Sequence, residues 1–196
     1  MPKTPRELAD DYLDRVIAHD PMLATSLGLP DGADRLSDFS PAGLDAEADL
    51  ARSALAALDA QDAQDALPAA DDAERRCARL LRERMSASLA LHEAGEHLRN
   101  VGTLFSPVQQ VRGIFLQMPS ATEEDWSVIG ARLGRVAEAL EGYRAGLGEG
   151  MRRRLVAGPG QVEAVVAQLR SWGADGGWFT AFAGRGPQAH RELLAA

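Results

Sequence analysis

The chain has 196 residues, of which 45% are hydrophobic and 26% are charged, a composition close to the average for globular proteins. This length is enough for one domain with a sizeable core and argues against a disordered chain. The 21 Lys and Arg residues against 29 Asp and Glu residues give a formal charge of -8, which repels phosphate backbones and anionic membranes, so we expect neither a nucleic-acid nor a membrane partner.

Helices are predicted from the start of the chain. Thr4-Pro5 followed by Glu7 has the form of a capping box, and apolar residues then recur every four positions, which predicts a helix over 5–19. The pair Asp20-Pro21 ends this helix because a residue before proline is pushed out of the helical region. A short second helix is expected over 21–27.

The next two helices are expected to be long. Ser40-Pro41 restarts the helical pattern, and an Ala-rich helix with a narrow apolar stripe continues to about Leu58. The Ala/Asp/Gln stretch 59–70 is predicted to be a loop or a frayed helix end. From Asp71 to Leu98, apolar residues recur at helical spacing, which predicts a helix of roughly 25 to 30 residues.

The C-terminal half continues in the same way. Ser106-Pro107 begins a helix that Pro119 is expected to stop. The acidic turn 122–125 begins a helix predicted to run for about seven turns, ending near Gly148. Further helical segments are expected at 162–172 and, as one or two short helices, in the tail 178–196.

The predicted fold class is therefore all-α. No segment alternates apolar and polar residues with the β-branched enrichment that a strand requires. Short connections between long helices predict an array of mostly antiparallel helices, bundle-like, within a single helical domain over 1–196.

The strongest local pattern for metal chemistry is His92-Glu93-Ala94-Gly95-Glu96-His97. Zinc peptidases place two histidines four residues apart on one helix face, whereas these two are five apart. On an unbroken helix the rings of His92 and His97 would point about 140° from each other, so we expect no shared metal. No residue of the chain is assigned a catalytic, cofactor-binding or metal-ligating role. An independent hydrolase that uses His92 or His97 with nearby carboxylates ranks below the other interpretations.

Cys77 is the only cysteine, which excludes an intramolecular disulfide and a thiolate zinc cluster. It lies on the apolar side of its helix, and no histidine shares that face within two turns, so we expect a buried and unreactive thiol despite the nearby Arg75, Arg76 and Arg79. Together with the lack of an export signal in the charged N-terminal run, this cysteine usage predicts a cytoplasmic location.

Glycine, arginine and aromatic residues favour structural roles. The clusters 146–150 and 158–160 lack a preceding strand and a following Lys-Ser or Lys-Thr, so they are expected to be helix ends and turns. The basic run 152–154 is expected to be a solvated helix face or a patch for an acidic partner. Core packing is expected for the aromatic residues Trp126, Trp172, Trp178, Phe179 and Phe182.

Several segments, in order along the chain, resemble the bacterial DUF885 family. They are PMLATSLG at 21–28, LSDFS at 36–40, NVGTLFSP at 100–107, Met118-Pro119 with 122–126, Arg132-Leu133, and YRAGL at 143–147. This family is similar in fold to zinc carboxypeptidases of the thermolysin-like group. The resemblance therefore implies that the chain corresponds to the N-terminal part of such a fold.

The same resemblance sets the expected function. Family members carry an HExxH helix and a downstream glutamate ligand in their later part, and no position of this chain matches those ligands, so zinc is expected only in full-length relatives. We expect a non-catalytic N-terminal helical region of a metallopeptidase-like DUF885 protein, which walls a peptide-binding cleft, holds no cofactor and is inactive alone. Its expected partner is the missing C-terminal catalytic region or a second copy of the chain, with a peptide as substrate of the full-length form.

A free-standing helical interaction or scaffold module of unknown function is the alternative. The first interpretation predicts an exposed apolar face larger than the few hundred Å² usual for a monomer, and hence self-association or poor solubility. The alternative predicts a well-covered monomer. Light scattering on the purified chain distinguishes the two.

Overall fold

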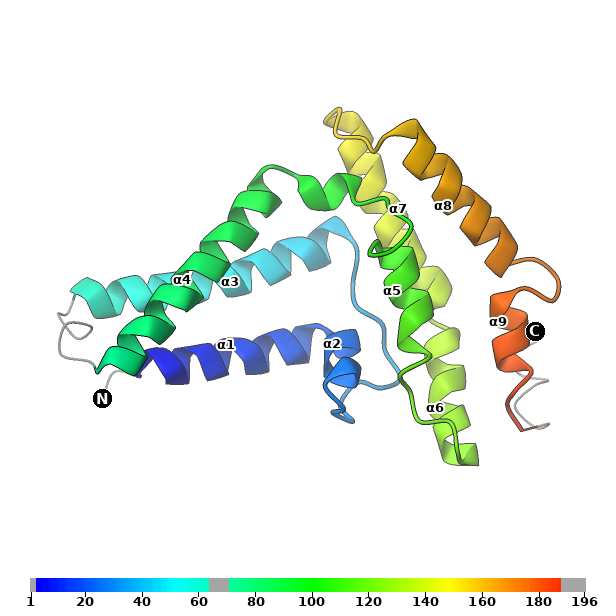
Figure 1. The fold of residues 1–196 in the computed structure, drawn as a ribbon, viewed down its shortest axis with the longest axis horizontal. Helices are drawn as coiled ribbons and strands as arrows, with labels where there is room; N and C mark the ends of the chain where they lie inside the picture. Colours follow the sequence, from blue (N-terminus) through cyan, green and yellow to red (C-terminus); the bar gives the residue numbers. More distant parts are fainter. Residues whose placement is uncertain (1–2, 64–70, 188–196) are drawn as a thin grey trace. The chain divides into compact units, whose positions relative to one another are not determined.

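The computed structural model describes residues 3–63 and 71–187, and all regular secondary structure in these two ranges is helical (Figure 1). The all-α, bundle-like prediction is confirmed. The chain forms two compact units: unit 1 comprises Met1–His19 with Ala42–His97, and unit 2 comprises Asp20–Pro41 with Leu98–Ala196. Within the described ranges, every helix is too short or too polar to cross a membrane.

Unit 1 has a core made of small and medium-sized side chains. Its helices are α1 (Pro5–His19), α3 (Pro41–Ala63) and α4 (Asp72–Glu93). The apolar stripes of α3 and α4 meet, and Leu8 and Tyr12 of α1 pack against them. The buried residues of this core are Ala48, Ala51, Ala54, Leu58, Ala78, Leu81, Met85 and Leu89.

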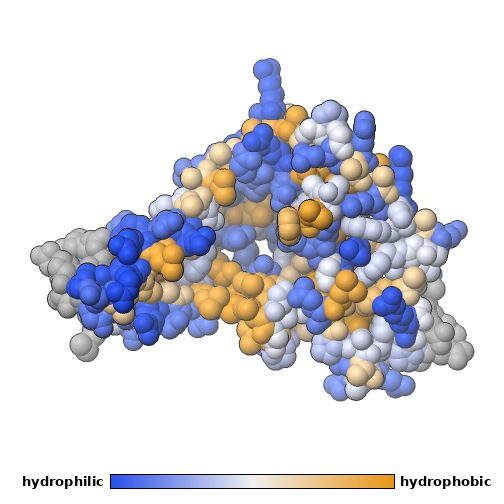
Figure 2. All heavy atoms as spheres, viewed as in Figure 1, coloured by the Kyte–Doolittle hydropathy of each residue, from blue (hydrophilic) through white to orange (hydrophobic). Residues whose placement is uncertain are grey.

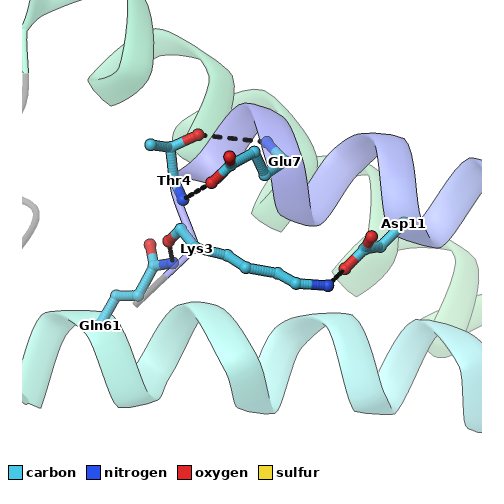
Figure 3. Close-up of polar contacts among 5 residues, drawn as sticks. All are labelled: Lys3, Thr4, Glu7, Asp11 and Gln61. Carbon is cyan, nitrogen blue, oxygen red and sulfur yellow. Dashed lines mark hydrogen bonds and ion pairs between the residues drawn. The ribbon is translucent and has the colours of Figure 1, made fainter. Parts of the chain in front are cut away.

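The predicted capping box at the start of α1 is present (Figure 3). The backbone N–H of Thr4 donates to Glu7 Oε2 at 2.7 Å, and the backbone N–H of Glu7 donates to Thr4 Oγ1 at 3.2 Å. Close by, Lys3 pairs with Asp11, and the side-chain amide of Gln61 donates to the carbonyl oxygen of Lys3. These contacts fix the first turn of α1 against the last turns of α3.

The contact with Gln61 bears on the end of α3. This helix continues to Ala63, so the prediction of a loop or frayed end is wrong for residues 59–63, and residues 64–70 lie outside the described part of the chain. Leu58 is fully buried in the core of unit 1, and Gln61 is also buried. Burial against the rest of unit 1 thus extends helix α3 into a stretch whose composition alone favours a loop.

Helix α4 begins as predicted and ends earlier than predicted. The Asp71 side chain accepts a hydrogen bond from the backbone N–H of Glu74, a standard N-cap. The helix then ends at Glu93, before the expected end near Leu98. Gly95 adopts a φ of +74°, a left-handed conformation that favours glycine, and a short 3₁₀ helix, η1 (Glu96–Arg99), follows.

Unit 2 has an aromatic core. Its helices are α2 (Pro21–Ser26), α5 (Pro107–Ile114), α6 (Glu123–Leu133), α7 (Val136–Arg152), α8 (Pro159–Trp172) and α9 (Trp178–Ala183). Large apolar side chains from all six helices and from the loops between them contribute to this core. The buried set is Met22, Phe39, Val108, Val111, Ile114, Phe115, Met118, Trp126, Ile129, Ala139, Tyr143, Val165 and Phe182.

Two predictions for unit 2 are wrong in their helix boundaries. Helix α5 ends at Ile114, before Pro119, because the backbone turns at 115–117. The single long helix expected from 122 is two helices, α6 and α7, separated by a turn at Gly134 and Arg135. The backbone N–H of Arg135 bonds to the carbonyl of Arg132, a 3₁₀-type contact that interrupts the α-helical pattern.

Helix α7 also continues through glycines that were predicted to form a helix end. Gly142, Gly146 and Gly150 repeat every four residues and so share one side of the helix. A Cβ added at Gly142 would lie 3.1 Å from the backbone nitrogen of Ser40, and one at Gly150 would overlap the carbonyl oxygen of Leu98. We call these three residues the α7 glycine face. Because they have no side chains, other backbone segments of unit 2 can pack closely against the helix here.

Candidate functional site

The histidine pair expected to diverge is in contact. The rings of His92 and His97 stack with centroids 4.3 Å apart and planes 7° apart. The expected divergence of about 140° assumed an unbroken helix, whereas α4 ends at Glu93 and the turn at Gly95 brings the second ring back over the first. Asp45 Oδ1 lies 3.0 Å from His92 Nε2. The assumption about the helix was therefore wrong.

The stacked arrangement is a poor chelate for a single metal ion. An imidazole nitrogen binds a metal through a lone pair in the plane of its ring, and two nearly parallel planes do not converge on one ion. Among residues 3–63 and 71–187, no group of three or more His, Cys, Asp and Glu side chains is placed to hold a metal. The stack instead packs the end of α4 against η1, and His92 also contacts Asp45 at the start of α3.

Cys77 is partly exposed rather than buried as predicted. Desolvation raises the pKa of its thiol, and the nearby carboxylate of Glu74 raises it further. Arg6 opposes these effects without reversing them. A raised pKa keeps the sulfur in its less nucleophilic thiol form, so the electrostatics favour the predicted unreactive role.

A pocket of about 380 Å³ lies within unit 2. The end of α2, the loop after it, the turn before α6 and the first turns of α6 form its walls. The lining residues are Thr25, Gly28, Leu29, Pro30, Ala33, Gln117, Met118, Pro119, Glu124, Asp125 and Val128. We call this the α2–α6 pocket. Its walls combine apolar surface with two carboxylates.

The carboxylate of Asp125 has a structural task in this wall. It accepts hydrogen bonds from the backbone N–H groups of Ala121 at 2.8 Å and of Thr122 at 2.9 Å, and Thr122 Oγ1 accepts one from the N–H of Asp125. These hydrogen bonds hold the pKa of Asp125 below its usual value, and the bond from the backbone of Thr122 has the largest effect. The resulting capping box keeps a negative charge beside Glu124.

A buried arginine lies behind the pocket wall. Arg132 of α6 is 0% exposed, and its Nη2 donates to Thr25 Oγ1 at 2.9 Å and to the carbonyl of Gly32 at 3.0 Å. Its Nε and Nη1 are buried and have no partner among the residues that the structure describes. Burial lowers the pKa of Arg132 to about 10, against the opposing attraction of Asp34 and Asp20. Arg132 therefore ties α6 to the segment that forms the opposite wall.

A second polar network links α5 to α7 and α8. The hydroxyl of Tyr143 donates to the carbonyl of Asn100 at 2.7 Å, and burial raises the pKa of Tyr143 to about 12. Ser106 is buried and contacts the side chain of Gln109, whose amide donates to Gln168 Oε1 at 2.8 Å. Buried polar groups of this kind are costly unless they are paired, so the network fixes how these helices meet.

The aromatic residues of unit 2 differ in how deeply they are buried. Trp126 and Phe182 are buried in the core of unit 2, as predicted. Trp172, Trp178 and Phe179 are only partly buried, and they pack against the same core, in agreement with the predicted role. The guanidinium carbon of Arg112 lies 4.7 Å from the ring centroid of Trp172 and 5.3 Å from that of Trp178. This arginine has cation–π contacts with both indoles.

The run Arg152–Arg154 is exposed, as predicted for a solvated face. Arg152 pairs with Glu149 one turn earlier in α7. Sequence reasoning missed Arg112 and Arg132, although a signal was available for the second. Arg132 follows Ile129 by three residues and so falls on the apolar side of its helix, where an arginine is unusual.

The model of the family described as "Bacterial protein of unknown function (DUF885)" matches residues 21–196. The chain belongs to the DUF885 family. A search of curated proteins found no match. The resemblance inferred from short segments is thus confirmed at the level of the family. In this DUF885 protein the match begins after α1 and includes all of unit 2 except Asp20.

Proposed function

We propose that this chain is the non-catalytic N-terminal helical region of a metallopeptidase-like DUF885 protein and that the α2–α6 pocket forms part of the wall of a peptide-binding cleft. The main support is where the family-like segments meet. Segments 21–28, 118–119 and 122–126 are far apart in the sequence, yet each supplies lining residues to this one pocket.

The dimensions and chemistry of the pocket suit a peptide side chain. Its volume lies at the lower end of the range for small-ligand sites, which suits one or two side chains. Leu29, Met118 and Val128 offer apolar contacts, while Glu124 and Asp125 contribute negative charge. We therefore propose a peptide in which an apolar side chain is adjacent to a cationic group.

Exposed apolar side chains support a protein or peptide partner. In the loop before α5, Leu104 is 72% and Phe105 is 81% exposed. Figure 2 shows apolar side chains (orange) reaching the surface in several separate patches among hydrophilic ones. Adjacent large apolar residues on a surface can mark a contact with another molecule, which is compatible with both the cleft-wall proposal and the interaction module.

Two measurements on the purified chain test this proposal. The first is a peptidase assay with added zinc, in which we expect no turnover. The second is NMR titration with the amidated dipeptide N-acetyl-Leu-Arg-NH₂, in which we expect shifts of the Met118 methyl signal. Zinc-dependent turnover that a chelator abolishes would contradict the non-catalytic role.

A pocket-filling variant makes the binding test specific. Val128→Trp places a large ring in the pocket and should weaken dipeptide binding at least tenfold. Val162→Trp, at an exposed position of α8, is the matched control and should leave binding unchanged. Equal binding by both variants would overturn the role of the pocket. A monomer by light scattering that binds no dipeptide would favour the interaction module instead.

A further inference from the structure

The setting of Arg112 differs from that of the surface arginines. Arg144 and Arg152 each pair with a glutamate three residues earlier in their own helix. Arg112 instead lies against two indoles, one at the last residue of α8 and one at the first residue of α9. Two aromatic contacts from different helices hold the guanidinium in a defined place.

Acidic side chains are scarce on the helices that carry Arg112 and its two indoles. Helices α5 and α9 contain no Asp or Glu. In α8 the only one is Glu163, nine residues before Trp172 and so about 13 Å away along the helix axis. Asp175, in the turn between α8 and α9, is exposed. Among residues 3–63 and 71–187, the ion pairs found do not include Arg112.

Within the described part of the chain, the hydrogen-bonding capacity of Arg112 is also unused. Its Nε is buried and has no hydrogen-bond partner among the described residues. Its terminal nitrogens Nη1 and Nη2 are not buried in this way, and they project from a side chain that is only partly covered. Buried polar atoms in proteins are usually paired, so the unpaired Nε is unusual, and Nη1 and Nη2 are the donors that a ligand could reach.

We propose that Arg112, Trp172 and Trp178 form a subsite for an organic carboxylate. The indoles contact the guanidinium, and the carboxylate binds at its accessible donor edge through paired N–H···O bonds. The partly exposed indoles then contact the apolar portion of the same ligand. The formal charge of -8 disfavours multiply charged anions, so a singly charged carboxylate next to an apolar group is the ligand class that fits.

Three dipeptide probes test the subsite and identify the source of the carboxylate. They are N-acetyl-Ala-Phe with a free C-terminus, the same dipeptide amidated, and amidated N-acetyl-Glu-Phe. The readout is the indole N–H signals in NMR spectra, assigned with Trp126→Phe, Trp172→Phe and Trp178→Phe. We expect the free acid to shift the signals of Trp172 and Trp178, and the amidated Ala-Phe probe to shift neither.

The Glu-Phe probe then separates two forms of the proposal. Binding by this probe as well as by the free acid supports a subsite for carboxylates in general. Binding by the free acid alone supports a subsite for a peptide C-terminus. Equal shifts with the amidated Ala-Phe probe, or no shifts with any probe, would overturn the proposal.

Substitutions distinguish a binding role from simple packing. Arg112→Met retains an apolar stem against the indoles and removes the donors, so folding should persist while affinity for the free acid falls at least tenfold. Arg170→Met, at an exposed arginine of α8, is the matched control and should bind as the unsubstituted chain does. Unchanged affinity in a folded Arg112→Met variant would show that Arg112 only packs. The α2–α6 pocket is reported by Met118, so the two proposals can fail separately.

Discussion

The two units bury their residues in different ways. Unit 1 packs alanines, leucines and one methionine along two long helices, whereas unit 2 surrounds Phe115 with aromatic side chains and buries Arg132, Ser106 and Gln109. A core of small residues lets helices pack closely but removes little apolar surface per residue. The comparison shows that the core of unit 1 rests on close helix packing, while unit 2 combines an aromatic core with buried polar groups and holds both of the sites proposed above.

The largest predicted effect tests whether the two cores are energetically separate. Phe115 is 1% exposed and contacts Trp178, Phe179 and Phe182, so Phe115→Ala should cost about 3–5 kcal/mol of unfolding free energy in unit 2. All three tryptophans of the chain lie in unit 2, so urea unfolding followed by tryptophan fluorescence reports this loss.

The matched substitution in unit 1 is Leu58→Ala. Leu58 is fully buried, and the change should cost about 2–5 kcal/mol. Circular dichroism reports both units, whereas tryptophan fluorescence reports unit 2 alone. If Leu58→Ala lowers the urea midpoint measured by fluorescence as much as the midpoint measured by dichroism, the two units unfold together. The distinction between two separate cores would then fail.

The next effect concerns the α7 glycine face. An added Cβ at Gly150 would overlap the carbonyl of Leu98 and lie 2.8 Å from that of Leu155, so Gly150→Ala should destabilise unit 2 by about 1–3 kcal/mol. Gly148 has open space, and Gly148→Ala should instead stabilise the helix by about 0.5–1 kcal/mol. Thermal unfolding of the two variants should give shifts of opposite sign. Two shifts of the same sign would contradict the close approach at Gly150.

These glycines also show which parts of the fold could be predicted. Helix starts were predictable because capping contacts are local, as at Thr4 and Thr122. Helix ends were not, because a glycine ends a helix at Gly95 but continues one at Gly146, where the carbonyl of Phe39 comes close. That difference depends on segments distant in the sequence.

The candidate sites were less predictable than the fold. The spacing of His92 and His97 led to a wrong geometry because the helix ends between them. The α2–α6 pocket unites three separated segments, and the contacts of Arg112 join α5 to the junction of α8 and α9. The spacing of residues within one helix carries no information about contacts between segments that are distant in the sequence.

The two tyrosines give a pH-dependent comparison, one in each unit. Burial raises the pKa of Tyr12 in unit 1, with Glu47 adding to the effect, and raises that of Tyr143 in unit 2 to about 12. An unfolded tyrosine loses its proton near pH 10, so the unfolded state is favoured as pH rises between about 10 and 12.

Stability from Tyr143 should therefore be complete below pH 10 and fall by about 1 kcal/mol at pH 11. Tyr143→Phe should remove this part of the alkaline loss, as measured by urea unfolding at pH 9 and pH 11. In the Tyr12→Phe variant only Tyr143 remains, so the tyrosinate absorbance should rise in one step at a pH well above 10. A Tyr143→Phe variant with the full alkaline loss would contradict the assignment.

The smallest expected effect lies in unit 1. Asp45 is largely exposed where it meets His92, and pairs of this kind contribute little in water. Asp45→Asn should change the unfolding free energy by less than about 1 kcal/mol in circular dichroism measurements. A larger loss of unfolding free energy would show that unit 1 also depends on a polar contact, as unit 2 does on Arg132, and would weaken the contrast between the units.

The α7 glycine face also restricts how this protein can vary in length. One residue inserted between Gly142 and Gly150 would rotate the later part of the helix by about 100° relative to the earlier part. The last glycine would then turn away from Leu98, and a bulkier neighbour would take its place against that carbonyl. Insertions and deletions among related chains should therefore cluster in the turns on either side of α7 and be absent from the helix itself.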